Sequence, residues 1–403
     1  MIHLQKHIRI ALTYFLAAAI LGVLLRFFSL ASFEFDYRYV VHAHSHIALL
    51  GWVYIALTTI IYKLFLEKRQ ITKKYRRLFG FTQVTIIGML LTFPFQGYAL
   101  FSILFSTLFL FASYRFLFLF EKYAKIDNEH GLSFKCLRWA LWYMALSSLG
   151  PWALGGIMTT LGVQSIWYRL AIYFYLHFQY NGWMVLSLVG LFVYVLEQNK
   201  LIIPKRKIGF FFWGLNAGIV LTYFLSVLWI MPPTFFYILG GLGALLQIGG
   251  ILVLVDINMN HFIQKFLSPF QWLLLRIVLL LFSIKMLLQL VTAFPYFANL
   301  AATYLDFTIG YLHWTFLGVI TVAIFFLLDY FRLLKIDKST FIAFFTGFVT
   351  LEVLIFYKGI SGWLGLPGFD FHILFLAVAS LVIALSIMIM LWKFRSAKVD
   401  KNP

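Results

Sequence analysis

The chain has 403 residues, of which 63% are hydrophobic and only 11% are charged. Soluble globular domains carry roughly a quarter charged residues, so this composition excludes a soluble protein and indicates an integral membrane protein in contact with the lipid bilayer. The formal net charge of +18 does not indicate a nucleic-acid partner, because the basic residues lie in short loops between apolar segments, as the positive-inside rule describes.

Apolar segments follow one another along nearly the whole chain, and a transmembrane helix needs about 20 mainly apolar residues. We therefore expect an all-α integral membrane protein with twelve transmembrane helices in a single polytopic domain, residues 1–403. The first segment is long and is read as a retained helix, not as a cleaved signal peptide. The expected spans are 8–31, 42–65, 78–95, 98–120, 137–160, 168–196, 207–230, 233–256, 269–294, 309–332, 340–357 and 370–394.

Basic loops indicate the orientation of these spans. Segments such as KLFLEKRQITKKYRR, EQNKLIIPKRK and the C-terminal KFRSAKVDKNP follow the even-numbered helices. The loops that follow odd-numbered helices, such as PFQG and MPPT, contain almost no lysine or arginine. The positive-inside rule then places both termini in the cytoplasm, and we expect a multi-pass protein of a bacterial inner (plasma) membrane.

An internal repeat accompanies three of the expected helices. A histidine, four residues and a glycine recur as His46 to Gly51 in the second helix, His177 to Gly182 in the sixth, and His313 to Gly318 in the tenth. These positions predict three pseudo-repeated four-helix arcs, with units of about 1–125, 126–256 and 257–403. One histidine per unit would lie at the same depth near the outer face. A fourth histidine opens the twelfth helix, where alanine takes the place of the glycine.

The stretch VHAHSHIALLGW places three histidines, His42, His44 and His46, at the start of the second helix. Histidine is costly on a lipid-facing surface, so we expect some of these rings to bind a metal or a cofactor. His42 and His46 share one helix face, while His44 points elsewhere. The alternative is that His42 and His44 lie in the hydrated headgroup layer.

With these histidines, the chain resembles the catalytic subunit of haem–copper oxidases and nitric oxide reductases, which have twelve spans in three arcs. The stretch from His44 to Trp52 is similar to a His-x-His-x4-Gly-Trp stretch of C-type oxidases, and the chain is more loosely similar to nitric-oxide-response haem–copper membrane proteins. The resemblance implies that His46, or its neighbour His44, and His313 are the axial ligands of a b-type haem. It implies a second haem, copper or iron centre at His177.

The sequence departs from that family at the second centre. The seventh helix has no histidine, and Asn181 stands where many oxidases have a tyrosine. His42, its neighbour His44 and His372 are therefore candidate replacement metal ligands. The alternative for His177 is a hydrogen-bonded structural cluster with its polar neighbours, and the alternative for His313 is an interfacial ring bonded to a backbone carbonyl.

Several other charged or titratable residues have expected positions. Arg38 and Arg169 lie near the outer face and are candidate partners of haem propionates, since arginine binds carboxylates bidentately; lipid phosphates or a loop salt bridge are the alternatives. Ionisable residues inside spans, Arg276, Lys285 and Glu352, are functional candidates. Four histidines are expected at the cytoplasmic surface: His3, His7, His130 and His261.

These observations leave three hypotheses open. The first is an oxidoreductase subunit that passes electrons through a bis-histidine haem to oxygen or nitric oxide, with an electron donor or other respiratory subunits as partners. The second is a non-catalytic nitric oxide- and haem-binding stress protein. The third is a twelve-helix transporter of metal ions or protons. Haem content separates the first two from the third, and turnover of a small gas separates the first from the second.

Overall fold

The computed structural model describes residues 2–31, 33–125, 130–201, 204–255 and 266–396. Every secondary-structure element within these ranges is a helix, as expected for an all-α protein. Eleven of the described helices are long and apolar enough to cross a membrane, so the chain is a multi-pass membrane protein. The expected repeat boundaries near residues 126 and 256, and His261, lie outside the described residues.

The expected span 137–160 is not a single helix in the structure. The structure forms α6 (Gly131–Ser147) and α7 (Leu149–Thr160), and neither is long enough to count among the eleven candidate spans. Pro151 explains the interruption, because proline lacks an N–H group and its ring would clash with the carbonyl of Ser147 in a continuous helix.

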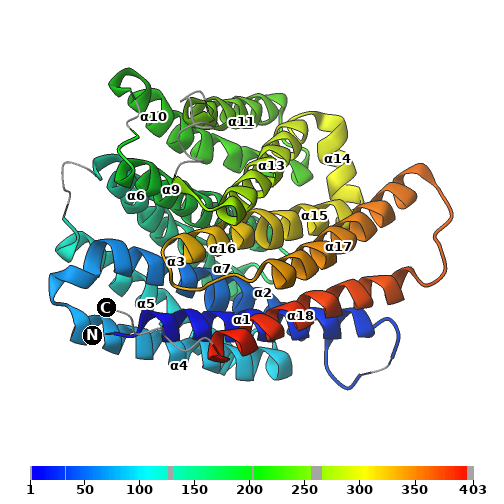
Figure 1. The fold of residues 1–403 in the computed structure, drawn as a ribbon. Coiled ribbons are helices and arrows are strands. Elements are labelled where there is room, and N and C mark those ends of the chain that lie inside the picture. Colours follow the sequence, from blue (N-terminus) through cyan, green and yellow to red (C-terminus); the bar gives the residue numbers. More distant parts are fainter. Residues whose placement is uncertain (1, 32, 126–129, 202–203, 256–265, 397–403) are drawn as a thin grey trace. The chain divides into compact units, whose positions relative to one another are not determined.

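The chain divides into two compact units, and the first comprises Met1–Leu119 and Ile324–Pro403. In Figure 1, α1 (blue) runs beside α18 (red), and α18 pairs with α17 (orange). The helices with most of their residues in this unit are α1 (Leu4–Phe27), α2 (Tyr37–His46), η1 (Ile47–Tyr54), α3 (Ile55–Ile61), η2 (Tyr62–Leu66), η3 (Glu67–Arg69), α4 (Thr72–Gln96), α5 (Leu100–Tyr123), α16 (Thr321–Tyr330), α17 (Lys338–Leu364) and α18 (His372–Ser396).

The second unit comprises Phe120–Ala323. Helices α10 and α11, drawn in green in Figure 1, pack extensively against each other, and α6 packs on α9. Besides α6 and α7, its helices are α8 (Ile166–His177), η4 (Phe178–Val185), α9 (Leu186–Gln198), α10 (Lys205–Thr222), η5 (Tyr223–Ile230), α11 (Thr234–Val255), α13 (Pro269–Val291), α14 (Pro295–Thr303), α15 (Leu305–His313) and η6 (Trp314–Ile320).

Aromatic packing forms the core of the first unit around the continuous helix from α2 to η3. Trp52 is 1% exposed, and its ring stacks on Phe15 with centroids 4.8 Å apart. Phe325 and Phe344 pack edge-on against each other in the same cluster. Buried aromatic area is a large source of stability, so this cluster fixes the helix that carries the triple histidine against α1.

The prediction that His7 lies at the surface is wrong. Its side chain is buried in α1, and its ring stacks on Phe79 with centroids 3.6 Å apart. The ring also lies within hydrogen-bond range of the Tyr75 hydroxyl, at 3.4 Å. An aromatic neighbour and a hydroxyl partner together satisfy an imidazole ring inside the helical core. His3, in contrast, is exposed as expected.

Candidate functional site

A change of helix type follows each of the three repeated histidines. His46, His177 and His313 each end an α-helix, and a π-helix begins at the next residue in every case. The three π-helices η1, η4 and η6 contain the glycines of the repeat. Because π-helical turns are rare and are frequent at functional sites, their recurrence after these histidines marks the three positions as candidates.

The glycines that follow His46 and His177 in the sequence pattern, Gly51 and Gly182, pack in the same way. A Cβ atom at Gly51 would lie 2.7 Å from the Cβ of Tyr14 in α1, and a Cβ atom at Gly182 would lie 2.7 Å from the Cβ of Tyr143 in α6. Such distances are shorter than carbon atoms tolerate, so both positions require glycine. The glycines therefore serve close approach of a tyrosine-bearing helix, one in each unit.

His46 is held by its own helix. Its Nδ1 lies 2.8 Å from the carbonyl oxygen of His42, and the ring stacks on Phe93 with centroids 4.3 Å apart. A carbonyl oxygen can only accept a hydrogen bond, so Nδ1 carries the proton and Nε2 carries the lone pair of the neutral ring. The side chain is half-buried, and the Tyr98 hydroxyl lies 3.4 Å from Nε2.

Tyr98 reaches this position through a tight turn between α4 and α5. Gly97 has a φ of +57°, and its missing side chain leaves space for the ring of Tyr39. Both conditions require glycine, because other residues rarely adopt a left-handed backbone. Tyr98 then packs edge-on against His42, with centroids 4.6 Å apart, as well as against His46.

His313 has the same anchor as His46. Its Nδ1 lies 3.0 Å from the carbonyl oxygen of Ile309, four residues earlier, and its side chain is also half-buried. The same reasoning gives the neutral ring a proton on Nδ1 and a lone pair on Nε2. Histidines that bind metals commonly donate their other ring nitrogen to a backbone carbonyl, which fixes the tautomer and the ring orientation.

His44 points to a different helix, as the spacing of the triple histidine predicts. Its Nδ1 lies 2.8 Å from the carbonyl oxygen of Ala18 in α1, and its ring lies close to Gly22 of the same helix. The side chain is half-buried. His44 therefore ties α2 to α1, while His42 and His46 face Tyr98.

His177 differs from His46 and His313. It is 1% exposed, its Nε2 donates to the carbonyl oxygen of Ile219 at 2.8 Å, and its Nδ1 lies 3.2 Å from the Ser226 hydroxyl. The Asn181 amide nitrogen lies 3.4 Å from the same Nδ1. Both ring nitrogens thus have protein partners, which is the geometry of the hydrogen-bonded alternative. Metal ligation by His177 stays a prediction that requires one of these bonds to open.

A buried lysine continues this network. Lys285 in α13 is 0% exposed, and its Nζ donates to Asn181 Oδ1 at 2.7 Å and to Gln289 Oε1 at 2.6 Å. Gln289 in turn donates to Gln247 Oε1 at 3.1 Å, and Gln247 donates to the Thr222 hydroxyl at 2.8 Å. Polar side chains from η4, α10, α11 and α13 thus meet inside the second unit.

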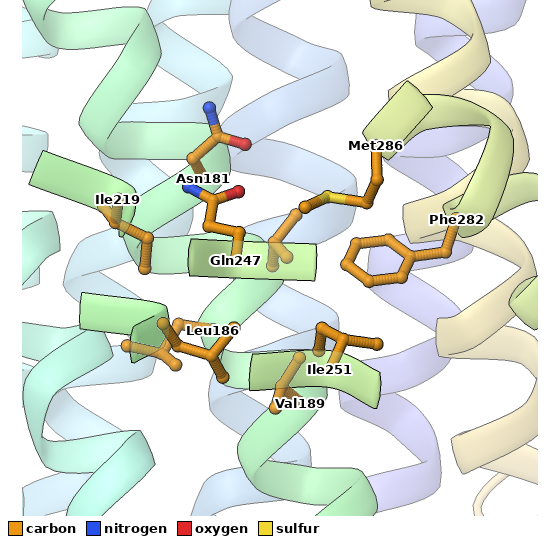
Figure 2. Close-up of a pocket in the computed structure, with 10 residues that line it drawn as sticks. Asn181, Leu186, Val189, Ile219, Gln247, Ile251, Phe282 and Met286 are labelled. Atoms are coloured by element: carbon orange, nitrogen blue, oxygen red, sulfur yellow. The ribbon is translucent and has the colours of Figure 1, made fainter. Parts of the chain in front are cut away.

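A small cavity adjoins this network. Figure 2 shows Asn181, Gln247, Met286 and Phe282 around it, with aliphatic side chains completing its wall. The sequence marked Lys285 but missed the two glutamines that join it to Thr222. The signal that could have found Gln247 and Gln289 is their polarity inside otherwise apolar helices, the argument already applied to Lys285.

The remaining candidate residues, His372, Arg38 and Arg169, lie elsewhere in the chain. His372 donates from Nε2 to the Leu354 carbonyl at 2.9 Å. Arg38 is exposed just after the Asp36 that begins α2, and Arg169 is exposed with its guanidinium 5.2 Å from the Trp229 ring centroid. Within the described ranges, no three His, Cys, Asp or Glu side chains cluster as a metal site would require.

Comparison with known proteins adds no relative. No protein-family model matches the sequence, and no curated protein sequence matches it. The candidate site is therefore argued from the residues of this chain.

Proposed function

We propose that this chain is a multi-pass membrane haem protein in which His46 and His313 are the axial ligands of a b-type haem. The observation that carries the proposal is the backbone hydrogen bond that these two histidines share. Each donates from Nδ1 to the carbonyl four residues earlier and directly precedes a π-helix. This leaves Nε2 as the nitrogen of each ring that would bind the haem iron, after the Tyr98 hydroxyl has moved away from the Nε2 of His46.

The residues present fit a haem in donor chemistry. His46 and His313 are half-buried and offer neutral imidazoles, which are common axial ligands of haem iron. When bound, the haem would supply one-electron transfer and binding of a small gas such as oxygen or nitric oxide. The chain would orient the two rings and exclude water. The exposed guanidinium groups of Arg38 and Arg169 are proposed partners of the propionates.

The proposal includes the finer architecture expected from the sequence. Three pseudo-repeated arcs are supported by the three π-helices that follow His46, His177 and His313, and by the tyrosine contacts at Gly51 and Gly182. Twelve spans, cytoplasmic termini and a bacterial plasma membrane complete this proposal. Its support is the distribution of basic loops.

The hydrogen bonds of His177 favour a non-catalytic haem protein over a complete gas-reducing enzyme. Binding of a second haem, copper or iron there would displace the Ile219 carbonyl or the Ser226 hydroxyl. The resemblance to haem–copper oxidases would then lie in the haem clamp, and the second centre would be lost. A steady turnover of oxygen or nitric oxide by the purified protein would reverse this preference.

A specific observation favours a second candidate, a transporter of protons or metal ions. Lys285 is 0% exposed and Glu352 is 2% exposed, and both lie in helices apolar enough to cross a membrane. Ionisable residues at such positions commonly mark ion pathways. Transport in vesicles prepared without haem would support this candidate.

The experiment that tests the proposal is haem quantification. The protein would be expressed with ample haem supply, purified in detergent and analysed as its pyridine haemochrome against protein concentration. We expect stoichiometric b-type haem. Protein that folds and remains monodisperse but contains no haem would remove the proposal and leave the transporter.

A further inference from the structure

A carboxyl group in the first unit has no hydrogen-bond partner. Glu352 lies near the middle of α17 and is 2% exposed. Neither of its carboxyl oxygens has a hydrogen-bond partner among the described residues. Buried polar atoms without partners are uncommon, and each one requires an explanation, such as an ion, a water molecule or a functional proton.

Burial limits the charge state that this group can hold. An isolated carboxylate inside an apolar environment is very costly, so such a group either finds a positive partner or takes up a proton. Glu352 lies within a helix that is apolar enough to cross the membrane, where no bulk water compensates the charge. Without a positively charged partner, Glu352 is therefore stable at this position only as a neutral carboxylic acid.

One positive group lies within electrostatic reach. Arg26, in the last turn of α1, interacts electrostatically with the Glu352 carboxyl and also with the His44 ring. Arg26 is half-buried, and most of the residues that follow it at the end of α1 are exposed. Its guanidinium can stabilise the carboxylate during the time after a proton leaves.

The helix that packs against α17 directs its basic groups elsewhere. On α18, His372 bonds to the Leu354 carbonyl and Lys393 lies 2.7 Å from Asp337. Close packing at Gly347, where an added Cβ would lie 3.0 Å from Ile383, leaves little room between the two helices. The charged group that acts on Glu352 is Arg26 of α1.

We propose that Glu352 is a proton-exchange site of the first unit. Its carboxyl group releases a proton to solvent beside Arg26 and becomes a carboxylate, and it takes a proton back to return to the neutral acid. No electron moves and no other bond changes. This site would let the protein couple protons to its membrane function, and it rests on Glu352 and Arg26, independently of the proposed haem.

Infrared spectroscopy of the purified protein tests the proposal. A protonated carboxylic acid has a carbonyl-stretching band that a carboxylate lacks. We expect this band near neutral pH, its shift when the solvent is changed to D2O, and its complete loss in Glu352→Gln. The matched control is Glu121→Gln, which removes a carboxylate that lies 2.8 Å from the Arg138 guanidinium and should leave the band intact.

Two results would overturn the proposal. Absence of the band from the unmodified protein would show that Glu352 is ionised, and a band that never shifts in D2O would show a structural acid that exchanges no proton. If Glu352→Gln does not fold, selective 13C labelling of glutamate in the unmodified chain keeps the test open. The labelled band must then shift, and Glu352→Asp must remove that glutamate band.

Discussion

The Nδ1 of His46 lies 2.8 Å from the carbonyl oxygen of His42, within the same helix. This contact decides which nitrogen of His46 can bind a metal. Because the carbonyl oxygen accepts a hydrogen bond from Nδ1, the proton is on Nδ1 and the lone pair is on Nε2. The same relationship joins His313 to Ile309 at 3.0 Å. Local backbone geometry therefore orients both rings with Nε2 as the nitrogen that carries the lone pair.

Replacement of the repeat glycines should disturb packing. In Gly51→Ala and in Gly182→Ala, the new methyl group would meet a tyrosine Cβ at 2.7 Å. Overpacking typically costs about 1–3 kcal/mol, so we expect a clearly lower unfolding temperature in detergent for each variant. Thermal unfolding followed by circular dichroism measures this change.

A glycine in an open position provides the matched control. A Cβ atom at Gly155 in α7 would meet no described atom within 4 Å. Since alanine is favoured over glycine in a helix by about 1 kcal/mol, Gly155→Ala should leave the unfolding temperature unchanged or raise it. Equal losses in Gly155→Ala and Gly51→Ala would contradict the close-packing account.

The loss of stability caused by replacing the buried Lys285 should depend on whether Asn181 is present. Lys285→Met removes the donor to Asn181 Oδ1, while Gln289 Oε1 keeps the Tyr311 hydroxyl. A buried acceptor without a partner costs about 1–3 kcal/mol. Asn181→Leu removes one of these acceptors. We therefore expect the double variant to be less destabilised than the sum of the single variants, by about 0.5–3 kcal/mol. Strict additivity in thermal unfolding would contradict a direct Lys285–Asn181 bond.

The N-cap of α17 should give a pH-dependent stability. Hydrogen bonds from Lys393, Ser339 and Thr340 hold the pKa of the Asp337 carboxyl well below its ordinary value. A lowered folded-state pKa stabilises the fold above the unfolded-state pKa, about 3.9, and this contribution is lost as the pH falls below it.

Asp337→Asn isolates this charge, because asparagine is also a good N-cap. Asp337 is partly exposed, and its pair with Lys393 is screened by solvent. We expect a modest decrease in unfolding temperature at pH 7 that becomes smaller toward pH 3.5 and in high salt. A decrease that stays constant with pH would show that the charge of Asp337 does not contribute.

Much of the fold is readable from the sequence because lipid imposes a simple length and polarity rule on helices. Among the residues that the structure describes, eleven helices meet this rule. The interruption at Pro151 was missed because the hydrophobic run continues through it, although proline itself was the available signal. His7 was misjudged from its basic neighbours, since aromatic partners such as Phe79 come from another helix.

The candidate site was readable in its residues but not in its geometry. The spacing from His46 to Gly51 was visible, but no local pattern shows that a π-helix starts there or that Tyr14 approaches the glycine. The neighbours of Lys285 likewise depend on tertiary packing. His177 bonds to a carbonyl of a different helix, whereas His46 bonds to a carbonyl four residues earlier in its own helix. The sequence alone does not show this difference.

The most direct measurement is a reduced-minus-oxidised absorption spectrum of the purified protein and of three single variants. We predict a sharp b-type haem signal in the unmodified protein and its loss in His46→Ala and in His313→Ala. His177→Ala should keep the signal, because the Nε2 of His177 donates to the Ile219 carbonyl and His177 is not one of the two proposed axial ligands. A full signal in His46→Ala and His313→Ala, with unchanged haem content, would contradict the proposed clamp.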